Sequence, residues 1–292
     1  MATGEAQPAS GRTLYVVATP LGNLRDVSLR ALDVLASVDI IAAEDTRVTA
    51  KLLARHGIST RLMSVHEHNE RRRAADVIAL LATGKSVALV SDAGTPAVSD
   101  PGATLVSAVA AAGFAIVPVP GPSAMIAALS AAGISAKKWL FCGFLPAGAA
   151  ARRTELERLR ACDCALVFYE APHRIAVTVD ALVAGLGAER ELVIARELTK
   201  RFESIHRCRL ADAPAWLAAD ADRQRGEFVL IVDSPVNADV RNEADPEHER
   251  TLSVLLAELP LAQAVRIAAA LTGASRKRLY ARALALALNR KA

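Results

Sequence analysis

The run from Asp92 to Gly102 is the segment whose residue types best suit ligand binding. It contains two glycines, two prolines and two aspartates, between a predicted strand at Ser86–Val90 and a predicted helix at Gly102–Ala112. Proline limits the entropy lost on binding, and glycine lets a ligand approach the main chain. Either aspartate could accept a hydrogen bond from an amino group or a ribose, although Asp100 could equally cap the helix. The run therefore predicts one wall of a ligand site.

Two further glycine-bearing loops follow predicted strands. Ala18–Leu24 comes after the strand Leu14–Ala18, and Pro118–Ala124 ends the strand Ala115–Val119. Open α/β sheets bind ligands beyond the carboxyl ends of their strands, so the three loops are expected to converge on one edge. The fingerprints G-x-G-x-x-G and G-x-x-x-x-G-K-[ST] are both missing from the sequence, which leaves dinucleotide and P-loop sites without support.

Alternating strand and helix patterns predict two α/β lobes with largely parallel sheet covered on both faces. The first lobe is expected at 13–134 and the second at 135–235. Residues 1–12 are small and polar and predict a disordered tail, while the acidic, proline-containing segment 236–250 resembles a linker.

The last segment, 251–292, predicts a basic helical appendage. A helix at Leu261–Leu271, a turn, and a second helix capped by Ser275 resemble a helix-turn-helix. From Arg250 onward, eight basic residues face one acidic residue, an excess of +7 in a chain whose net charge is +4. This excess indicates contact with nucleic acid, although the helices could instead only dock on the enzyme. The candidate RNA-binding side chains here are Arg276, Lys277, Arg278 and Arg282.

Composition excludes some classes of protein. No apolar run reaches the roughly 18 residues of a membrane helix, and the amino terminus lacks the apolar stretch of a signal peptide, so we expect a cytoplasmic protein without a membrane partner. The four cysteines have no paired C-x-x-C spacing. Reduced thiols, buried or half-buried, are therefore expected, and no metal site is predicted.

Nine short segments, in order along the chain, resemble those of the tetrapyrrole methylase superfamily, and within it closely those of the small-subunit ribosomal RNA cytidine 2′-O-methyltransferases. The resemblance covers about Leu14–Val232, with a similar helical tail. The segments are Tyr15–Leu24, Ala43–Arg47, His66–Glu70, Ser91–Pro96, Ser99–Gly102, Pro120–Ala124, Gly143–Pro146, Tyr169–Arg174 and Arg196–Lys200.

The resemblance implies a homodimer that binds S-adenosylmethionine in a cleft between the lobes. It also implies methylation of a ribose in small-subunit ribosomal RNA, at the decoding-centre cytidine, on naked RNA or in the assembled subunit. The residues expected to hold the cofactor are Pro20, Asp92, Gly94, Thr95, Pro96, Ala97, Ser123, Ala124, Phe144 and Leu145.

Methyl transfer to a ribose requires in-line alignment and removal of a proton of high intrinsic pKa. Lys200 and Arg174 could lower the hydroxyl's pKa or hold adjacent phosphates, and Arg47 could contact the RNA. Glu170, Glu197 or His68 could take the proton. Other interpretations remain open: Glu70–Arg73 is expected to be a solvated helix face but could touch phosphate, and Arg196 could pair internally with Glu197.

Two alternative functions remain. One is a small-molecule methylase of the tetrapyrrole type, and the other is a nucleic-acid-binding protein without catalysis. Ala93–Pro96 replaces the shorter Gly-Asp-Pro loop of porphyrin-modifying members, and a porphyrin enzyme has no need of a basic tail. Some 220 residues of loop-rich α/β pattern argue against the non-catalytic alternative.

Overall fold

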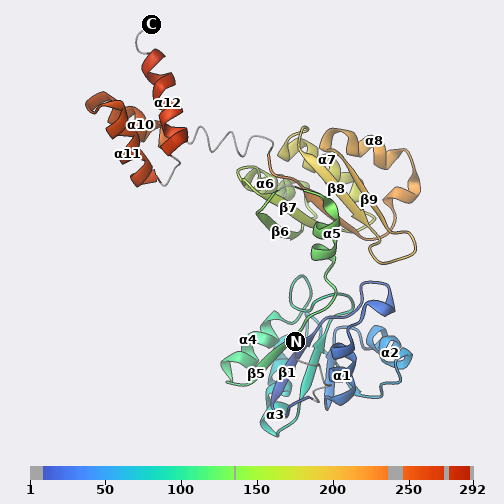
Figure 1. The fold of residues 1–292 in the computed structure, drawn as a ribbon. Coiled ribbons are helices and arrows are strands. Elements are labelled where there is room, and N and C mark those ends of the chain that lie inside the picture. The colour runs from blue at the N-terminus through green and yellow to red at the C-terminus, as the bar shows by residue number, and fades with distance from the viewer. Residues whose placement is uncertain (1–8, 135, 236–245, 273–275, 290–292) are drawn as a thin grey trace. The chain divides into compact units, whose positions relative to one another are not determined.

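The computed structural model describes residues 9–134, 136–235, 246–272 and 276–289. The chain forms two compact units that divide after Asp233. The first unit contains two lobes, each built around a five-stranded sheet (Figure 1). No helix among the described residues is long and apolar enough to span a membrane.

The sheet of the first lobe is entirely parallel, in the order β3-β2-β4-β1-β5. Its strands are β1 (Thr13–Val17), β2 (Ile40–Ala43), β3 (Arg61–Ser64), β4 (Val87–Val90) and β5 (Ala115–Val119). Helices cover both of its faces, as the sequence predicts. They are α1 (Leu29–Ser37), α2 (Thr46–Arg55), α3 (Glu70–Ala82) and α4 (Ala103–Ala111).

Side-chain alternation along the strands explains the two covered faces. Leu14 and Leu89 pack with α3 and α4, whereas Tyr15 and Ala88 pack with α1 and α2. Strand β3 is an addition to the predicted elements. It is a short edge strand with one exposed and three half-buried residues, so it lacks a strong apolar signal.

The second lobe has a mixed sheet in the order β6-β7-β10-β8-β9. Strands β6 and β7 pair in parallel. Strand β10 runs antiparallel to both of its neighbours, β7 and β8, and β9 runs antiparallel to β8. The strands are β6 (Trp139–Phe144), β7 (Ala165–Glu170), β8 (Glu191–Arg196), β9 (Ser204–Arg209) and β10 (Phe228–Val232). The expectation of largely parallel sheet therefore holds for the first lobe alone.

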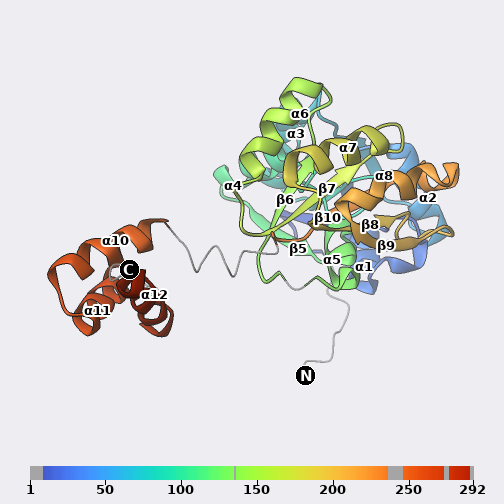
Figure 2. The ribbon, with the colours of Figure 1, turned by 90° about the horizontal axis from the view of Figure 1, so that it is seen from above.

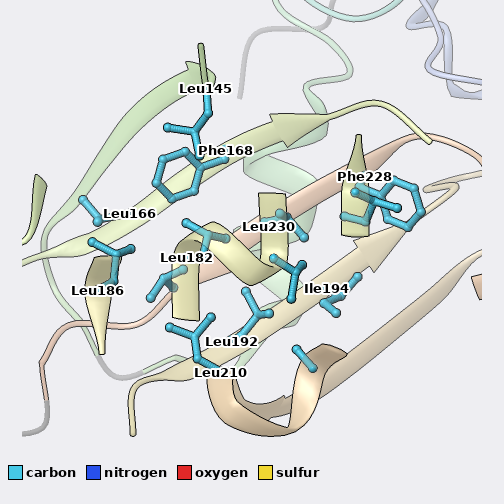
Figure 3. Packing of buried hydrophobic residues seen from close by; sticks show 14 of the residues in the cluster. Leu145, Leu166, Phe168, Leu182, Leu186, Leu192, Ile194, Leu210, Phe228 and Leu230 are labelled. Atoms are coloured by element: carbon cyan, nitrogen blue, oxygen red, sulfur yellow. The ribbon is translucent and has the colours of Figure 1, made fainter. Parts of the chain in front are cut away.

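Helices α6 (Ala149–Leu159), α7 (Ile175–Leu186) and α8 (Ala213–Ala218) cover one face of this sheet (Figure 2). Their apolar side chains meet Phe168, Ile194 and Leu230 in a continuous core (Figure 3). Helix α5 (Ala124–Ala132) covers the other face, where Ala128 and Ala132 pack against strands β7, β8 and β10. The helix predicted as the end of the first lobe thus packs on the second.

The last unit consists of α10 (Pro246–Glu258), α11 (Leu261–Thr272) and α12 (Arg276–Asn289). Leu252, Val265 and Leu279, one from each helix, share its core. The predicted linker 236–250 is too long, because α10 begins at Pro246. Proline is tolerated as the first helical residue, where its missing N–H costs no hydrogen bond. The predicted cap Ser275 lies outside the described residues.

Part of the predicted tail at 1–12 is bonded to the first lobe. Ala9 donates its N–H to Ser37 Oγ, and the Ser10 N–H donates to the Tyr15 hydroxyl at 2.7 Å. The Arg12 N–H donates to the carbonyl of Lys85. Residues 9–12 are therefore attached to the first lobe, and residues 1–8 lie outside the described part.

Candidate active site

A cavity of about 340 Å³ lies between the two lobes of the first unit. First-lobe loops that follow β1, β4 and β5 form one side, and ends of second-lobe strands form the other. This volume is within the range of about 300–1,000 Å³ typical of small-molecule sites. The lining residues are Leu21, Ala93, Gly94, Thr95, Val98, Ser99, Asp100, Ser123, Ala124, Phe144, Tyr169, Glu170, Ala171, Pro172, Ala195, Leu198, Glu227, Phe228 and Val229.

The three first-lobe loops are tied together by hydrogen bonds. Thr19 and Gly94 exchange both main-chain hydrogen bonds, at 2.9 and 3.0 Å. Thr95 Oγ1 donates to the carbonyl of Pro122 at 3.0 Å, joining the β4 loop to the β5 loop. Gly94 adopts a φ of 82°, which favours glycine. Its role is therefore to shape the loop, and its own N–H and carbonyl are already used.

The end of the β4 loop is fixed from a neighbouring helix. Glu70 Oε1 accepts hydrogen bonds from the N–H groups of Gly102 and Leu105 at 3.0 and 2.9 Å. These groups belong to the start of α4, whose first N–H groups have no partner within the helix. Glu70 is buried and caps α4, so the interpretation of Glu70 as part of a solvated face is wrong.

Negative charge and aromatic rings characterise the cavity. Asp100 and Glu227 bring carboxylates to it, and burial raises the pKa of Asp100. Phe144 and Tyr169 supply rings, which meet edge to face at 5.9 Å. No lysine, arginine or histidine is among the described lining residues. Carboxylates and ring faces attract a cation, so the lining fits the sulfonium and ammonium groups of S-adenosylmethionine.

Five of the residues predicted to hold the cofactor line this cavity: Gly94, Thr95, Ser123, Ala124 and Phe144. Pro20 and Pro96 are buried and lie outside the lining, as does Ala97. Ala97 has a positive φ of 64° and packs closely against Gly102. A Cβ placed on Gly102 would lie 3.3 Å from the Cβ of Ala97. These three residues shape the loops.

Asp92 and Leu145 do not reach the cavity. Asp92 is exposed, and its Oδ1 accepts the N–H of Asp45 at 2.9 Å. Leu145 is buried in the core of the second lobe beside Phe168 (Figure 3). Asp100, which the sequence left undecided between ligand contact and helix cap, lines the cavity, while Gly102 is the N-cap residue of α4.

Glu170 and Arg174 support the fold around the cavity. The Glu170 carboxylate accepts hydrogen bonds from Thr178 Oγ1 at 2.6 Å and from the Ala171 N–H at 2.8 Å, and it pairs with Arg174. Its side chain is 0% exposed, so what Glu170 shows to the cavity is main chain. Arg174 also donates to the carbonyl of Leu145. A fully bonded, enclosed carboxylate is poorly placed to accept a proton from substrate.

Glu197 and Lys200 form an ion-paired cluster with Glu227. Lys200 Nζ lies 2.9 Å from both Glu197 Oε1 and Glu227 Oε2. Burial acts to raise the pKa of Glu197, but Lys200 and the Glu227 N–H outweigh it and hold that pKa below its usual value. The two carboxylates likewise raise the pKa of Lys200 against the effect of burial. Both groups are therefore charged near neutral pH, and neither is a good proton acceptor.

The remaining predicted residues of the first unit lie away from the cavity. His68 is exposed next to His66, at a ring separation of 6.0 Å. Arg47 is exposed and forms a two-pronged pair with Asp45, which lowers the pKa of that carboxyl to about 2. Arg196 donates to the carbonyls of Arg225 and Phe202 instead of pairing with Glu197.

All four cysteines are free and partly buried, as predicted. Burial raises the pKa of Cys142 to about 12 and that of Cys208 to about 11, so these thiols stay protonated. Within the described part of the chain, no group of three or more His, Cys, Asp or Glu side chains is placed to hold a metal ion.

The second unit carries the predicted RNA-binding residues on α12. Arg276 and Arg282 are exposed at the helix surface, whereas the side chains of Lys277 and Arg278 lie outside the described part.

Sequence reasoning missed Glu227, Tyr169 and Leu198 as lining residues. Glu227 directly precedes β10 without any motif, so only the folded chain brings it to the cavity.

Comparison with known proteins gives two family matches. The model of the Tetrapyrrole (Corrin/Porphyrin) Methylases matches residues 13–214, and that of the RsmI C-terminal HTH domain matches residues 242–287. Two proteins named Ribosomal RNA small subunit methyltransferase I are similar over almost their whole length. The protein from Pseudomonas aeruginosa is 48% identical to this chain, over 94% of this chain and 98% of its own length. The protein from Vibrio cholerae is 46% identical, over 96% of this chain and 97% of its own length.

Solved structures show the same fold. Uroporphyrin-III-C-methyltransferase from Thermus thermophilus superimposes with a TM-score of 0.54 at 22% identity, over 76% of this chain and 94% of that one. Cobalt precorrin-4 methyltransferase gives a TM-score of 0.57 at 15% identity, over 80% and 98%. The predicted α/β fold with a helix-turn-helix appendage is thus confirmed. The chain belongs to the tetrapyrrole methylase family, and within it to the group named ribosomal RNA small subunit methyltransferase I.

Proposed function

We propose that this protein methylates a ribose 2′-hydroxyl of small-subunit ribosomal RNA, at cytidine 1402 of the decoding centre, with S-adenosylmethionine as donor. The cavity between the lobes carries the proposal, because it presents carboxylates and aromatic rings without a described cation. Such a lining suits a cationic donor. The names of the relatives support ribosomal RNA as the acceptor, and the reaction would take place in the cytoplasm.

The same charge pattern disfavours a tetrapyrrole acceptor. A tetrapyrrole that carries several carboxylates needs basic side chains around it, and among the described lining residues there are none. A protein that only binds nucleic acid would have no use for the cavity between the lobes. Methyl transfer to RNA therefore accounts for more of the molecule than either alternative.

The bound donor supplies a methyl group already activated by its sulfonium. The protein's own residues have to hold the donor, align the ribose hydroxyl and accept a proton. Ser123 and Ala124 line the first-lobe side of the donor site next to the loop shaped by Gly94 and Thr95, and Phe144 and Tyr169 provide apolar walls from the second lobe. These contacts would fix the direction of the methyl group.

Asp100 is the proposed proton acceptor. It lines the cavity, and burial raises its pKa, which makes its carboxylate a stronger base than an exposed aspartate. Glu227 also reaches the cavity, but its carboxylate lies 2.9 Å from Lys200 Nζ. Lys200 thus balances part of the negative charge near the acceptor while remaining outside the lining itself.

The family resemblance also leads us to propose a homodimer. The edge strand β6 supports this proposal, because it leaves one side unpaired and exposes Trp139 and Leu140, by 44% and 41%. Sedimentation equilibrium should give twice the monomer mass of 30.7 kDa. A monomer at micromolar concentration would contradict this part of the proposal.

The proposed reaction can be tested with purified protein, S-adenosylmethionine and small ribosomal subunits that lack the methyl group. Mass spectrometry of nuclease fragments should find one added methyl on the ribose of the decoding-centre cytidine. Parallel reactions with naked RNA would show which form is the substrate. A methyl group on a base, or transfer only to a small molecule such as a tetrapyrrole, would overturn the 2′-O assignment.

A further inference from the structure

The cavity leaves the phosphates of an RNA substrate without a counter-charge. Its lining brings Asp100 and Glu227 and, among described residues, no cation, whereas RNA carries a negative charge at every nucleotide. A ribose hydroxyl can enter such a cavity only if the flanking phosphates are bound elsewhere. The cations that bind these phosphates are therefore expected on the rim of the cavity.

One stretch of the rim joins the two lobes. The N–H of Asn23, in the loop after β1, donates to Thr199 Oγ1 in the loop between β8 and β9 at 3.2 Å. These loops approach each other in Figure 1. Leu21 and Leu198, next to the contact on each side, line the cavity. The residues that follow Asn23 and Thr199 therefore lie just outside its mouth.

Two exposed guanidinium groups occur at this place. Arg25 follows Asn23 by two residues, and Arg201 follows Thr199 by two. Neither forms an ion pair with a described carboxylate. Lys200, by contrast, is neutralised by Glu197 and Glu227. Arg25 and Arg201 are therefore the side chains of this rim that remain available to phosphate.

An aromatic ring accompanies them. Phe202 is 62% exposed, and the guanidinium carbon of Arg201 lies 5.6 Å from the centre of its ring. Rings beside cations are the arrangement on which single-stranded nucleic acids stack their bases.

The loop that carries Arg201 and Phe202 is held in place. Arg196 Nη1 donates to the carbonyl of Phe202 at 3.1 Å, and the Thr199 N–H donates to Glu203 Oε2 at 2.5 Å. Glu197 and Thr199 adopt positive φ angles of 50° and 67°, which are strained for residues other than glycine. Such strain persists where the surroundings fix it, and it is concentrated at functional sites.

We propose that Arg25, Arg201 and Phe202 form an RNA-binding rim on the catalytic unit. The two guanidinium groups bind phosphates beside the target ribose, and Phe202 stacks on a neighbouring unpaired base. This inference rests on the proposed function, because it assigns the surface that presents the RNA to the cavity. The nucleic acid it fits is a single strand, since a base inside a duplex does not expose its face to a side chain.

The first test uses the full chain with Arg25→Gln, Arg201→Gln and Phe202→Ala, and with Arg153→Gln on α6 as a matched control, since Arg153 is also exposed. Each rim variant should raise the KM for RNA about fivefold or more, because each removes a stacking or phosphate contact. Calorimetry should find the affinity for S-adenosylmethionine unchanged, and Arg153→Gln should leave KM within about twofold.

Salt dependence separates the two kinds of contact. Each arginine variant should lower the slope of log affinity against log salt by about 0.7, the value for one phosphate contact on a single strand. Phe202→Ala should leave the slope unchanged and lower the affinity at every salt concentration. Phe202→Tyr should restore affinity, because the tyrosine ring can stack in the same way.

Direct contact can be read without catalysis. In a Phe202→Trp variant with Trp139 and Trp216, the two native tryptophans, replaced by Phe, RNA should quench the fluorescence of the new side chain. If the wild-type enzyme methylates RNA, two results would overturn the RNA-binding rim. One is unquenched fluorescence, and the other is rim variants whose KM for RNA equals that of the wild type. Variants impaired on assembled subunits but not on naked RNA would assign the surface to a protein partner and also overturn it. A wild-type enzyme that methylates no RNA would instead overturn the proposed function.

Discussion

Lys200 of the second lobe lies directly over Gly22 of the first. A Cβ placed on Gly22 would be 2.4 Å from Lys200 Cγ, closer than real side chains approach. The Lys200 ammonium is fixed at its other end by Glu197 and Glu227. The stem of this lysine therefore forms part of the contact between the lobes, beside the Asn23–Thr199 hydrogen bond.

Gly22→Ala should disturb this contact. Because Cγ lies near the fixed main chain, Lys200 cannot yield by moving its end alone, and overpacking of this kind costs about 1–3 kcal/mol. We expect the dissociation constant for S-adenosylmethionine to rise about tenfold, as measured by calorimetry. Gly148→Ala is the control, since a Cβ there would meet nothing within 4 Å. Equal affinities of the two variants would mean that the lobes close independently of this contact.

Glu70→Ala should lower the free energy of unfolding by about 1–3 kcal/mol, because it leaves the buried N–H groups of Gly102 and Leu105 without an acceptor. Glu70→Gln should lose less, since the amide oxygen can still accept. Urea denaturation provides the measurement, with Glu67→Ala, at an exposed position, as control. Wild-type stability of Glu70→Ala would show that water replaces the carboxylate.

The roles of Glu70 and Asp100 show what sequence can and cannot predict here. Strand–helix alternation predicts most of the first lobe, because its central strands β1, β2 and β4 are buried on both faces. The Gly, Pro and Asp residues of the β4 loop predict a ligand-binding loop at its position. Which aspartate reaches the cavity depends on the path of that loop. Glu70 accepts a hydrogen bond from Gly102, the N-cap residue of α4, which lies 32 residues further along the chain. No local pattern encodes either contact.

The second lobe illustrates the same limit for catalytic residues. Glu170 and Arg174 have suitable types at strand and helix ends, yet they pair with each other, and Glu170 also accepts a hydrogen bond from Thr178 Oγ1. Glu227 has no motif and reaches the cavity because β10 lies between β7 and β8. The antiparallel insertion of this last strand is a long-range pairing, which periodicity along the chain does not predict.

Asp100→Asn tests the proposed proton acceptor. The amide keeps the size of the side chain but removes its basicity, so kcat should fall at least about 100-fold, the lower end of the contribution of general base catalysis. Calorimetric affinity for S-adenosylmethionine should also fall, because the carboxylate attracts the cationic donor, but by much less than kcat. Asp92→Asn is the control, because Asp92 lies outside the cavity lining. A large loss of cofactor affinity at unchanged kcat would assign Asp100 to binding instead.

Trp216 should report the protonation of His206. The two rings stack at 3.9 Å, and the Arg223 guanidinium carbon lies 4.6 Å from the Trp216 ring. Burial, and then the charge of Arg223, lower the pKa of His206 below its usual 6.5. In a Trp139→Phe background, fluorescence should fall as the pH drops below 6.5, and Arg223→Met should shift the midpoint upward.

The stability linked to His206 has a defined sign. Because its pKa is lower in the folded than in the unfolded chain, the contribution is complete above pH 6.5 and is lost as the pH falls through the folded value. His206→Gln should abolish both the fluorescence change and this part of the pH dependence. A titration that persists in His206→Gln would have to come from another group.

Truncation after Pro235 should separate cofactor binding from RNA binding. The helices α10 to α12 have their own core around Leu252, Val265 and Leu279, and the chain divides after Asp233. The shortened protein retains every residue of the cavity lining, so its affinity for S-adenosylmethionine should stay within about twofold. Its affinity for RNA should fall and become less dependent on salt, because the +7 excess has been removed.

A full-length variant with four glutamines shows whether charge or the mere presence of the helices is responsible. The replaced residues are Arg276, Lys277, Arg278 and Arg282. If the charges bind phosphate, this variant should reproduce the weakened RNA binding and lower the salt slope by up to about 0.7 per contact. If it binds RNA like the wild type while the truncated chain loses cofactor affinity, then the appendage supports the enzyme's structure, and the rim at Arg25 and Arg201 has to supply the contacts to phosphate.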